Sequence, residues 1–343
     1  MVESILDKKL SGVDNLSFNP VDLGMAPLPL NVLIPGTKIP ADLFLAGFSR
    51  EKDRVEMIPA TSKGEIFQVE WRENLIRAGQ KKVYVSMDET PALTAYFGEY
   101  TKKIMDNPKT TRKEKSAFVH EMASFNLRLL FGSDLSQGAM NKAVNSTSSA
   151  IDMMLRDNQI LTRLAELLKT DYTVYSHSVN VSMLAMGFSR FMKQTEGQVR
   201  TLGLGGMLME VGLAKIEIKM KDKPDESEQT RKSLYRNHTR YGYDLLKMIS
   251  AVPYDVLMIV LDHHENIDGS GYPNGKKGDS IPYPAQVIRV IDTYDTLTSP
   301  SSDREAYAPL EAGHYLKEFS GTKFCQSIVT SFLRFMGSPY FTN

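Results

Sequence analysis

Apolar residues recur at the 3.6-residue period of an α-helix in nearly every segment from residue 134 to the end of the chain. A helix with one apolar stripe is stable only when that stripe is buried against another element. Residues 134–343 are therefore predicted to form an all-α bundle. The clearest amphipathic or buried helical segments are 141–169, 175–193, 197–216, 239–249, 253–264 and 284–298.

The N-terminal part of the chain has a different texture. The first thirty residues, rich in Gly and Pro, indicate an irregular or extended lead-in. Residues 41–48 and 81–87 have the composition of short strands, and residues 66–79 have helical spacing that ends at a glycine. We predict a small α/β accessory module over residues 1–105 and a helical connector over 106–133, so that the whole protein is mainly α.

Composition excludes several classes of partner. The 41 basic residues balance the 41 acidic ones, which argues against capture of a nucleic acid polymer or an anionic membrane. No stretch approaches the ~18–20 apolar residues of a membrane span, and the N-terminus lacks a signal-peptide pattern. The single cysteine, Cys325, fits a reducing compartment. The sequence therefore predicts a soluble, cytoplasmic protein.

Polar chemistry gathers where the apolar run PYDVLMIVLD ends in two histidines, His263 and His264. A loop with glycines at four positions and a proline, DGSGYPNGKKG, follows directly. Neutral imidazole binds Mn, Fe, Ni and Zn, and a glycine-rich backbone can approach a ligand closely. An isolated pair of histidines is more often a helix cap, but this pair followed by this loop indicates a metal site.

The stretch HHENIDGSGYPNGKKGDSIPYPAQVIRVIDTYDTLTS resembles the signature of HD-GYP domains, bacterial metal-dependent phosphohydrolases that cleave cyclic di-GMP. Two upstream stretches, HSVNVSMLAMGFS and NHTRYGYDLL, are similar to helices of that family. The resemblance covers roughly residues 134–337 and implies an HD-type helical bundle. It also implies cyclic di-GMP as ligand and a divalent metal, Fe or Mn, as cofactor.

Carried over position by position, the resemblance implies metal ligands. His238, His263 and His264 would hold one ion, and Asp292 would serve a second ion with support from His177. A carboxylate from the family's H-D pair would bridge the two ions and activate a water.

The H-D pair is where this chain departs from the family. Met209 stands at the histidine position and Glu210 at the aspartate position. A thioether is a soft, weak donor, so one ligand is lost. Glu210 keeps the carboxylate but moves its oxygens by ~1.5 Å, which matters in a site where positions count to about 0.2 Å. We expect one ion rather than two, with hydrolysis reduced or absent.

Substrate contacts are also altered. Gly271, Tyr272 and Pro273 of the loop are expected to contact the ligand. The family's arginine-containing run after T-S is matched here only by Arg304 after a short insertion, and Glu305 next to it would repel phosphate. Lys215 stands two residues beyond the place of a lysine that commonly follows the H-D segment. We assign Lys215 and Glu210 as the candidate catalytic residues.

Three functions remain open. The first is a catalytically impaired HD-GYP domain that senses cyclic di-GMP or acts as a signalling scaffold, binding a partner protein through the GYP loop or the N-terminal module. The second is an active phosphodiesterase that hydrolyses cyclic di-GMP to pGpG or GMP. The third is a purely structural interaction domain, which the retained histidines and Asp292 disfavour because buried imidazoles need partners.

Overall fold

The computed structural model describes residues 20–49, 52–108, 110–132, 136–156, 173–221, 227–300 and 304–338. The chain divides into two compact units, Met1–Thr110 and Thr111–Asn343. Each unit is described by itself.

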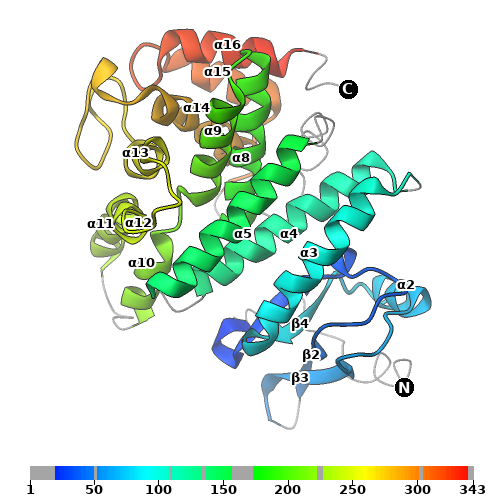
Figure 1. The fold of residues 1–343 in the computed structure, drawn as a ribbon. Helices are drawn as coiled ribbons and strands as arrows, with labels where there is room; N and C mark the ends of the chain where they lie inside the picture. The colour runs from blue at the N-terminus through cyan, green and yellow to red at the C-terminus, as the bar shows by residue number, and fades with distance from the viewer. Residues whose placement is uncertain are drawn as a thin grey trace. The chain divides into compact units, whose positions relative to one another are not determined.

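The N-terminal unit is built on a four-stranded antiparallel sheet with the order β1-β4-β2-β3 (Figure 1). The register pairs Leu28 with Val83 and Phe44 with Tyr84. Both predicted strands of this module are present, as β2 and β4. The elements are β1 (Met25–Pro29), β2 (Leu43–Ser49), β3 (Arg54–Thr61), β4 (Lys82–Ser86), α2 (Val69–Arg77), α3 (Thr90–Asp106) and the 3-10 turns Pro20–Leu23, Leu30–Val32 and Met87–Glu89.

Two strands of the sheet lie in stretches that the sequence left without strand assignment. β1 belongs to the expected irregular lead-in and contains Pro27 and Pro29, and β3 contains Pro59. Both are edge strands, and a proline is tolerated there because its missing N–H is not needed by a second neighbour. The predicted helix is α2, and it is followed by Gly79 at φ +79°, where a left-handed residue ends the helical segment.

The C-terminal unit is helical (Figure 1). Its helices are α4 (Arg112–Gly132), α5 (Gln137–Arg156), α8 (Val174–Phe191), α9 (Glu196–Leu208), α10 (Leu213–Lys221), α11 (Glu228–Arg236), α12 (His238–Leu246), α13 (Tyr254–Asp262), α14 (Tyr283–Thr298), α15 (Pro309–Glu318) and α16 (Gln326–Met336), with a 3-10 turn at Gly278–Ser280. The predicted helical segment 141–169 is described only as far as Arg156, and its remainder lies outside the described residues. The predicted fold class, mainly α with an all-α C-terminal bundle after a small α/β region, is confirmed.

Helix α8 is the central element of the bundle. It packs against α9, α14 and α4, and nearly all of its side chains are buried. Thr173 begins the helix with a capping box, in which its hydroxyl accepts from the backbone N–H of Ser176 while the Ser176 hydroxyl accepts from that of Thr173. A helix buried on most of its surface can carry polar groups only where those groups have partners, and His177 of α8 has its partners on α14.

Glycines let α9 approach its neighbours closely. A Cβ at Gly206 would lie 2.9 Å from the backbone of Ser182 in α8, and a Cβ at Gly205 would overlap Ile259 of α13. The turn after α9 is equally tight, because a Cβ at Gly212 would overlap the carbonyl oxygen of His238 at the start of α12. This packing brings the ends of α9, α12 and α13 to one place.

Among the described helices, none combines the length and the apolar character that crossing a membrane requires.

Candidate metal centre

His263 follows the last residue of the buried helix α13 and is itself fully buried. Its Nδ1 lies 3.2 Å and 3.1 Å from the carbonyl oxygens of Ile259 and Val260. A carbonyl oxygen can only accept, so Nδ1 carries the proton and Nε2 keeps its lone pair. Burial lowers the pKa of His263 to about 4, despite the opposing charge of Glu210, and the ring is therefore neutral near pH 7.

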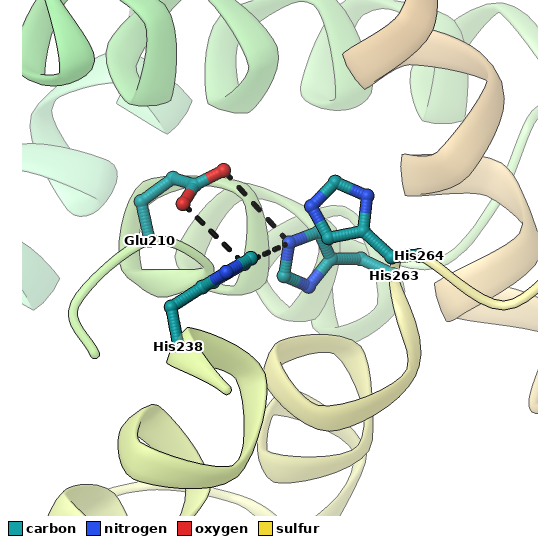
Figure 2. A group of neighbouring side chains, drawn as sticks. All are labelled: Glu210, His238, His263 and His264. Carbon is teal, nitrogen blue, oxygen red and sulfur yellow. Dashed lines mark hydrogen bonds and ion pairs between the residues drawn. The ribbon is translucent and has the colours of Figure 1, made fainter. Parts of the chain in front are cut away.

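His238 is the first residue of α12 and has the same tautomer. Its Nδ1 donates to the carbonyl oxygen of Tyr235 at 2.6 Å, which leaves the Nε2 lone pair available. That Nε2 lies 3.3 Å from the Nε2 of His263 (Figure 2). Two lone pairs directed at each other repel unless a cation lies between them, so the two rings are arranged as ligands.

Glu210 completes the opposite side of this cluster from the turn between α9 and α10 (Figure 2). Its Oε2 lies 3.4 Å from Nε2 of His238, and its Oε1 lies 3.9 Å from Nε2 of His263. The side chain is buried, and within the described residues Oε2 has no hydrogen-bond donor of good geometry. A buried carboxylate without full hydrogen bonding indicates a missing positive partner.

His264 contributes a third imidazole. Its Nε2 is buried and has no hydrogen-bond partner among the described residues, and burial holds its pKa well below the ordinary value. One ligand atom from each of Glu210, His238, His263 and His264 falls within 4.8 Å of the others. Two ligands bound ~2.1 Å from one ion lie roughly 3.0–3.4 Å apart, as do the two Nε2 atoms. The donor set therefore fits one divalent ion.

A second group, His177, Glu210 and Asp292, shares Glu210 with the first. His177 of α8 lies between two carboxylates of α14, with Nε2 3.1 Å from Oδ1 of Asp292 and Nδ1 2.7 Å from Oδ2 of Asp295. Burial alone would raise the pKa of Asp292, but the hydrogen bond from His177 and nearby positive charges, including Arg289, hold it below its usual range. Two members of this second group, His177 and Asp292, are thus already paired with each other and with neighbours.

A cavity of about 480 Å³ opens beside both groups. Its size falls within the usual range for small-molecule sites. Four candidate ligands line it, together with side chains of α8, α10, α14 and α15. The lining residues are Val174, His177, Glu210, Leu213, Tyr235, His264, Arg289, Asp292, Thr293, Thr296, Leu297 and Tyr315.

The glycine-rich loop folds back onto the histidines. Tyr272 stacks on the ring of His264 with centroids 4.7 Å apart and planes at 28°, and its N–H donates to the His264 carbonyl oxygen at 3.2 Å. Gly271 has no room for a Cβ, which would overlap the backbone of residues 264–266. The carbonyl oxygen of Pro273 accepts from Arg240 at 3.2 Å. Gly271 and Tyr272 therefore support His264, and the described lining of the cavity includes neither of them nor Pro273.

Two buried carboxylates hold the loop in this position. Glu265 accepts from the backbone N–H groups of Asn274 at 2.7 Å and Lys276 at 3.0 Å. Asp262 pairs with the Lys276 ammonium at 2.6 Å, and burial raises the Asp262 pKa against the effect of that lysine. Lys276 therefore ties the loop to the last residue of α13 through a buried partner.

The remaining predicted site residues lie differently. Lys215 has its Nζ 5.0 Å from the ring centroid of Tyr241, and Arg304 donates to the carbonyl oxygens of Thr296, Leu297 and Glu305. Neither is among the described residues that line the cavity. Met209 is fully buried at the end of α9.

Sequence reasoning missed two residues of the site, Arg289 and Asp295. Each is three positions from Asp292 on α14, and side chains with that spacing share a helix face. That spacing is the signal that would have identified them.

Comparison with known proteins gives a family match and several relatives. The HD domain family matches residues 151–328, which is more than half of the chain. Cyclic di-GMP phosphodiesterase PA4108 of Pseudomonas aeruginosa is 30% identical over 184 residues, covering 54% of this chain and 44% of that protein. Cyclic di-GMP phosphodiesterase response regulator RpfG of Xanthomonas campestris pv. campestris is 28% identical over 200 residues, covering 58% and 53%. The chain thus spans about half the length of these curated relatives.

A solved structure shares the fold. Bd1817, a HDG"Y"P protein from Bdellovibrio bacteriovorus, superposes with a TM-score of 0.66 at 17% identity, covering 92% of this chain and all of that one. The likeness extends beyond the helical unit into the N-terminal one.

The chain belongs to the HD domain family. The predicted membership of the HD-GYP group within it is confirmed.

Proposed function

We propose that this protein binds cyclic di-GMP at a one-metal centre and hydrolyses it slowly or not at all, acting as a sensor of that nucleotide. The relatives named as cyclic di-GMP phosphodiesterases support the ligand class. The facing Nε2 atoms of His238 and His263, 3.3 Å apart, carry the proposal of a metal. The Met209–Glu210 pair motivates the proposal of reduced turnover.

Three imidazoles and one carboxylate would hold the ion: His238, His263, His264 and Glu210. This mixed N and O donor set suits Fe or Mn better than a soft metal. When bound, such an ion neutralises charge on a phosphate oxygen and lowers the pKa of a bound water. The protein's own contribution is to fix the tautomers of His238 and His263 by backbone carbonyl groups and to hold His264 against Tyr272.

The observations also bear on the alternatives. A purely structural domain gains nothing from two buried lone pairs that face each other. An active two-metal phosphodiesterase is favoured by the second group, His177, Glu210 and Asp292, whose ligand atoms also lie within 4.8 Å of one another. The H-D pair has nevertheless lost its histidine at Met209, and Nε2 of His177 is already in contact with Oδ1 of Asp292.

One preparation can test these alternatives. The full chain is purified without chelator, its metal content is measured, and cyclic di-GMP binding and hydrolysis are followed in the same sample. We expect one ion per chain and saturable binding with little or no turnover. Two ions with steady turnover would establish the active enzyme instead, and a chain that holds neither metal nor nucleotide would leave the structural alternative.

A further inference from the structure

Arg289 of α14 lies one helical turn before Asp292, and its guanidinium is held on three sides. Its Nε donates to Oδ1 of Asn266 at 3.1 Å, and its Nη1 donates to Oγ1 of Thr293 at 3.1 Å and lies 3.5 Å from Oδ2 of Asp292. The group also lies 5.5 Å from the ring centroid of Phe324. These contacts fix the plane and position of the guanidinium.

The third nitrogen of this guanidinium, Nη2, has a different environment. Nη2 has no hydrogen-bond partner among the described residues. The side chain is 18% exposed and is one of those that line the cavity. Of the described residues that line this cavity, Arg289 alone is a lysine or an arginine. The two cations expected from the sequence lie elsewhere, since Arg304 donates to backbone carbonyl oxygens and Lys215 stacks over Tyr241.

The position of this charge relates directly to the metal ligands. Asp292 has His177 at one oxygen and Arg289 near the other, so a fixed positive charge already lies beside the carboxylate that a second ion would need. An arginine fork offers donors in a plane that matches the oxygens of a phosphate. A divalent ion beside the same carboxylate would be repelled by that charge.

We infer that Arg289 takes the role of the second cation, with its free edge donating to a non-bridging phosphate oxygen of a phosphodiester bound at the Glu210–His264 side of the cavity. This inference rests on the proposed function for its ligand class. It assigns phosphate recognition to α14 in place of the segment around Arg304.

The test compares two arginines under the same change. Arg289→Gln removes the charge and keeps an amide donor, and Arg304→Gln makes the same change outside the described lining of the cavity. In full-length, metal-loaded protein, Arg289→Gln should weaken cyclic di-GMP binding about 10- to 100-fold, the effect of losing one charged hydrogen bond. Arg304→Gln should change it less than about threefold, and Arg289→Lys should retain part of the affinity.

Metal content and thermal stability, measured on the same variants, distinguish a role of Arg289 in ligand binding from a role in holding the structure together. An affinity loss in Arg289→Gln with metal content no lower than in the unchanged protein supports the inference. Unchanged affinity overturns it. A loss of affinity matched by an equal loss of metal or by a collapse in stability also overturns it, because Arg289 would then only hold the loop through Asn266. A larger loss in Arg304→Gln than in Arg289→Gln also overturns it.

A second probe keeps this inference separable from the proposed function. If the unchanged protein binds no cyclic di-GMP, the proposed function fails, and inorganic phosphate becomes the probe for Arg289. Phosphate binding that is present in the unchanged protein and lost in Arg289→Gln supports the assignment. Absence of phosphate binding in the unchanged protein overturns it.

Discussion

The metal centre has two halves, which differ in whether their buried polar groups find partners within the chain. The histidine half is His238, His263 and His264, whose rings are neutral or fixed by backbone carbonyl groups and whose free nitrogens meet in one small space. The carboxylate half is His177, Asp292, Asp295 and Arg289, in which His177 contacts both aspartates and Arg289 lies beside Asp292. Glu210 lies within reach of both.

The difference concerns what each half needs from outside the chain. The histidine half leaves lone pairs without a partner and is complete only with a cation. In the carboxylate half, His177 already contacts Asp292 and Asp295, so a second ion would have to displace a histidine–aspartate contact and tolerate a neighbouring guanidinium. Ligand residues that lie close together therefore do not by themselves indicate how many ions a site holds.

The largest expected effect comes from removing a ligand of the histidine half. His263→Ala should lower metal affinity at least about 100-fold, more than the loss of an outer-shell partner usually costs. The matched variant His177→Ala should keep close to one ion per chain. Metal analysis after gel filtration measures both, and equal losses in the two variants would remove the distinction between the halves.

The second-largest expected effect is a gain of metal and of hydrolytic activity. Met209→His combined with Glu210→Asp restores the family's pair. If these two positions are the only defect, the site should take up a second ion and hydrolysis of cyclic di-GMP should rise at least about tenfold, whereas no second ion is expected if the Arg289 charge excludes it. Met209→Leu, which has similar volume and no ligand atom, serves as control. If the double variant gains metal without turnover, the altered phosphate contacts also limit the reaction.

The metal-free protein should lose stability as pH falls from 7 to 4. The His263 ring protonates near pH 6.5 when unfolded and only near 4 when folded, so the unfolded state binds more protons in between. This costs roughly 3 kcal/mol of unfolding free energy at the acid end. Asp292, with a lowered pKa, contributes stability that is lost only below about pH 4, so Asp292 itself should not add to the slope across this window.

Urea unfolding in chelator at several pH values measures this dependence. His263→Gln should show a shallower slope than the unchanged protein. An identical slope in the variant would assign the effect to other buried histidines, such as His120, whose pKa burial also lowers.

The smallest effect is expected at Asp295. Its pKa is raised by burial, although the hydrogen bond from His177 opposes this, so the carboxyl group accepts a proton more readily than usual. Asp295→Asn has the shape of that protonated form and should cost only about 1 kcal/mol of unfolding free energy. Metal content should stay near one ion, and its loss would show that the two halves depend on each other.

The sequence predicted the parts of this molecule that short-range patterns determine. The helical bundle followed from apolar periodicity, and the histidine half followed from His263, His264 and the loop after them. The edge strands β1 and β3 were not predicted, because their prolines indicate irregular chain unless the edge position of the strand is known. Arg289 was not predicted because its role depends on Asn266 and Thr293 fixing its guanidinium beside a cavity, which no linear motif encodes.

Gly212 bears on how substitutions can alter this site during evolution. Because the carbonyl oxygen of His238 lies where a Cβ of residue 212 would be, main chain rests on main chain between the Glu210 turn and α12. The distance between Glu210 and His238 is thus set by backbone packing and does not depend on which side chain occupies position 209. A family member can exchange a ligand there and keep its architecture, and the reverse exchange can restore the ligand without a new fold.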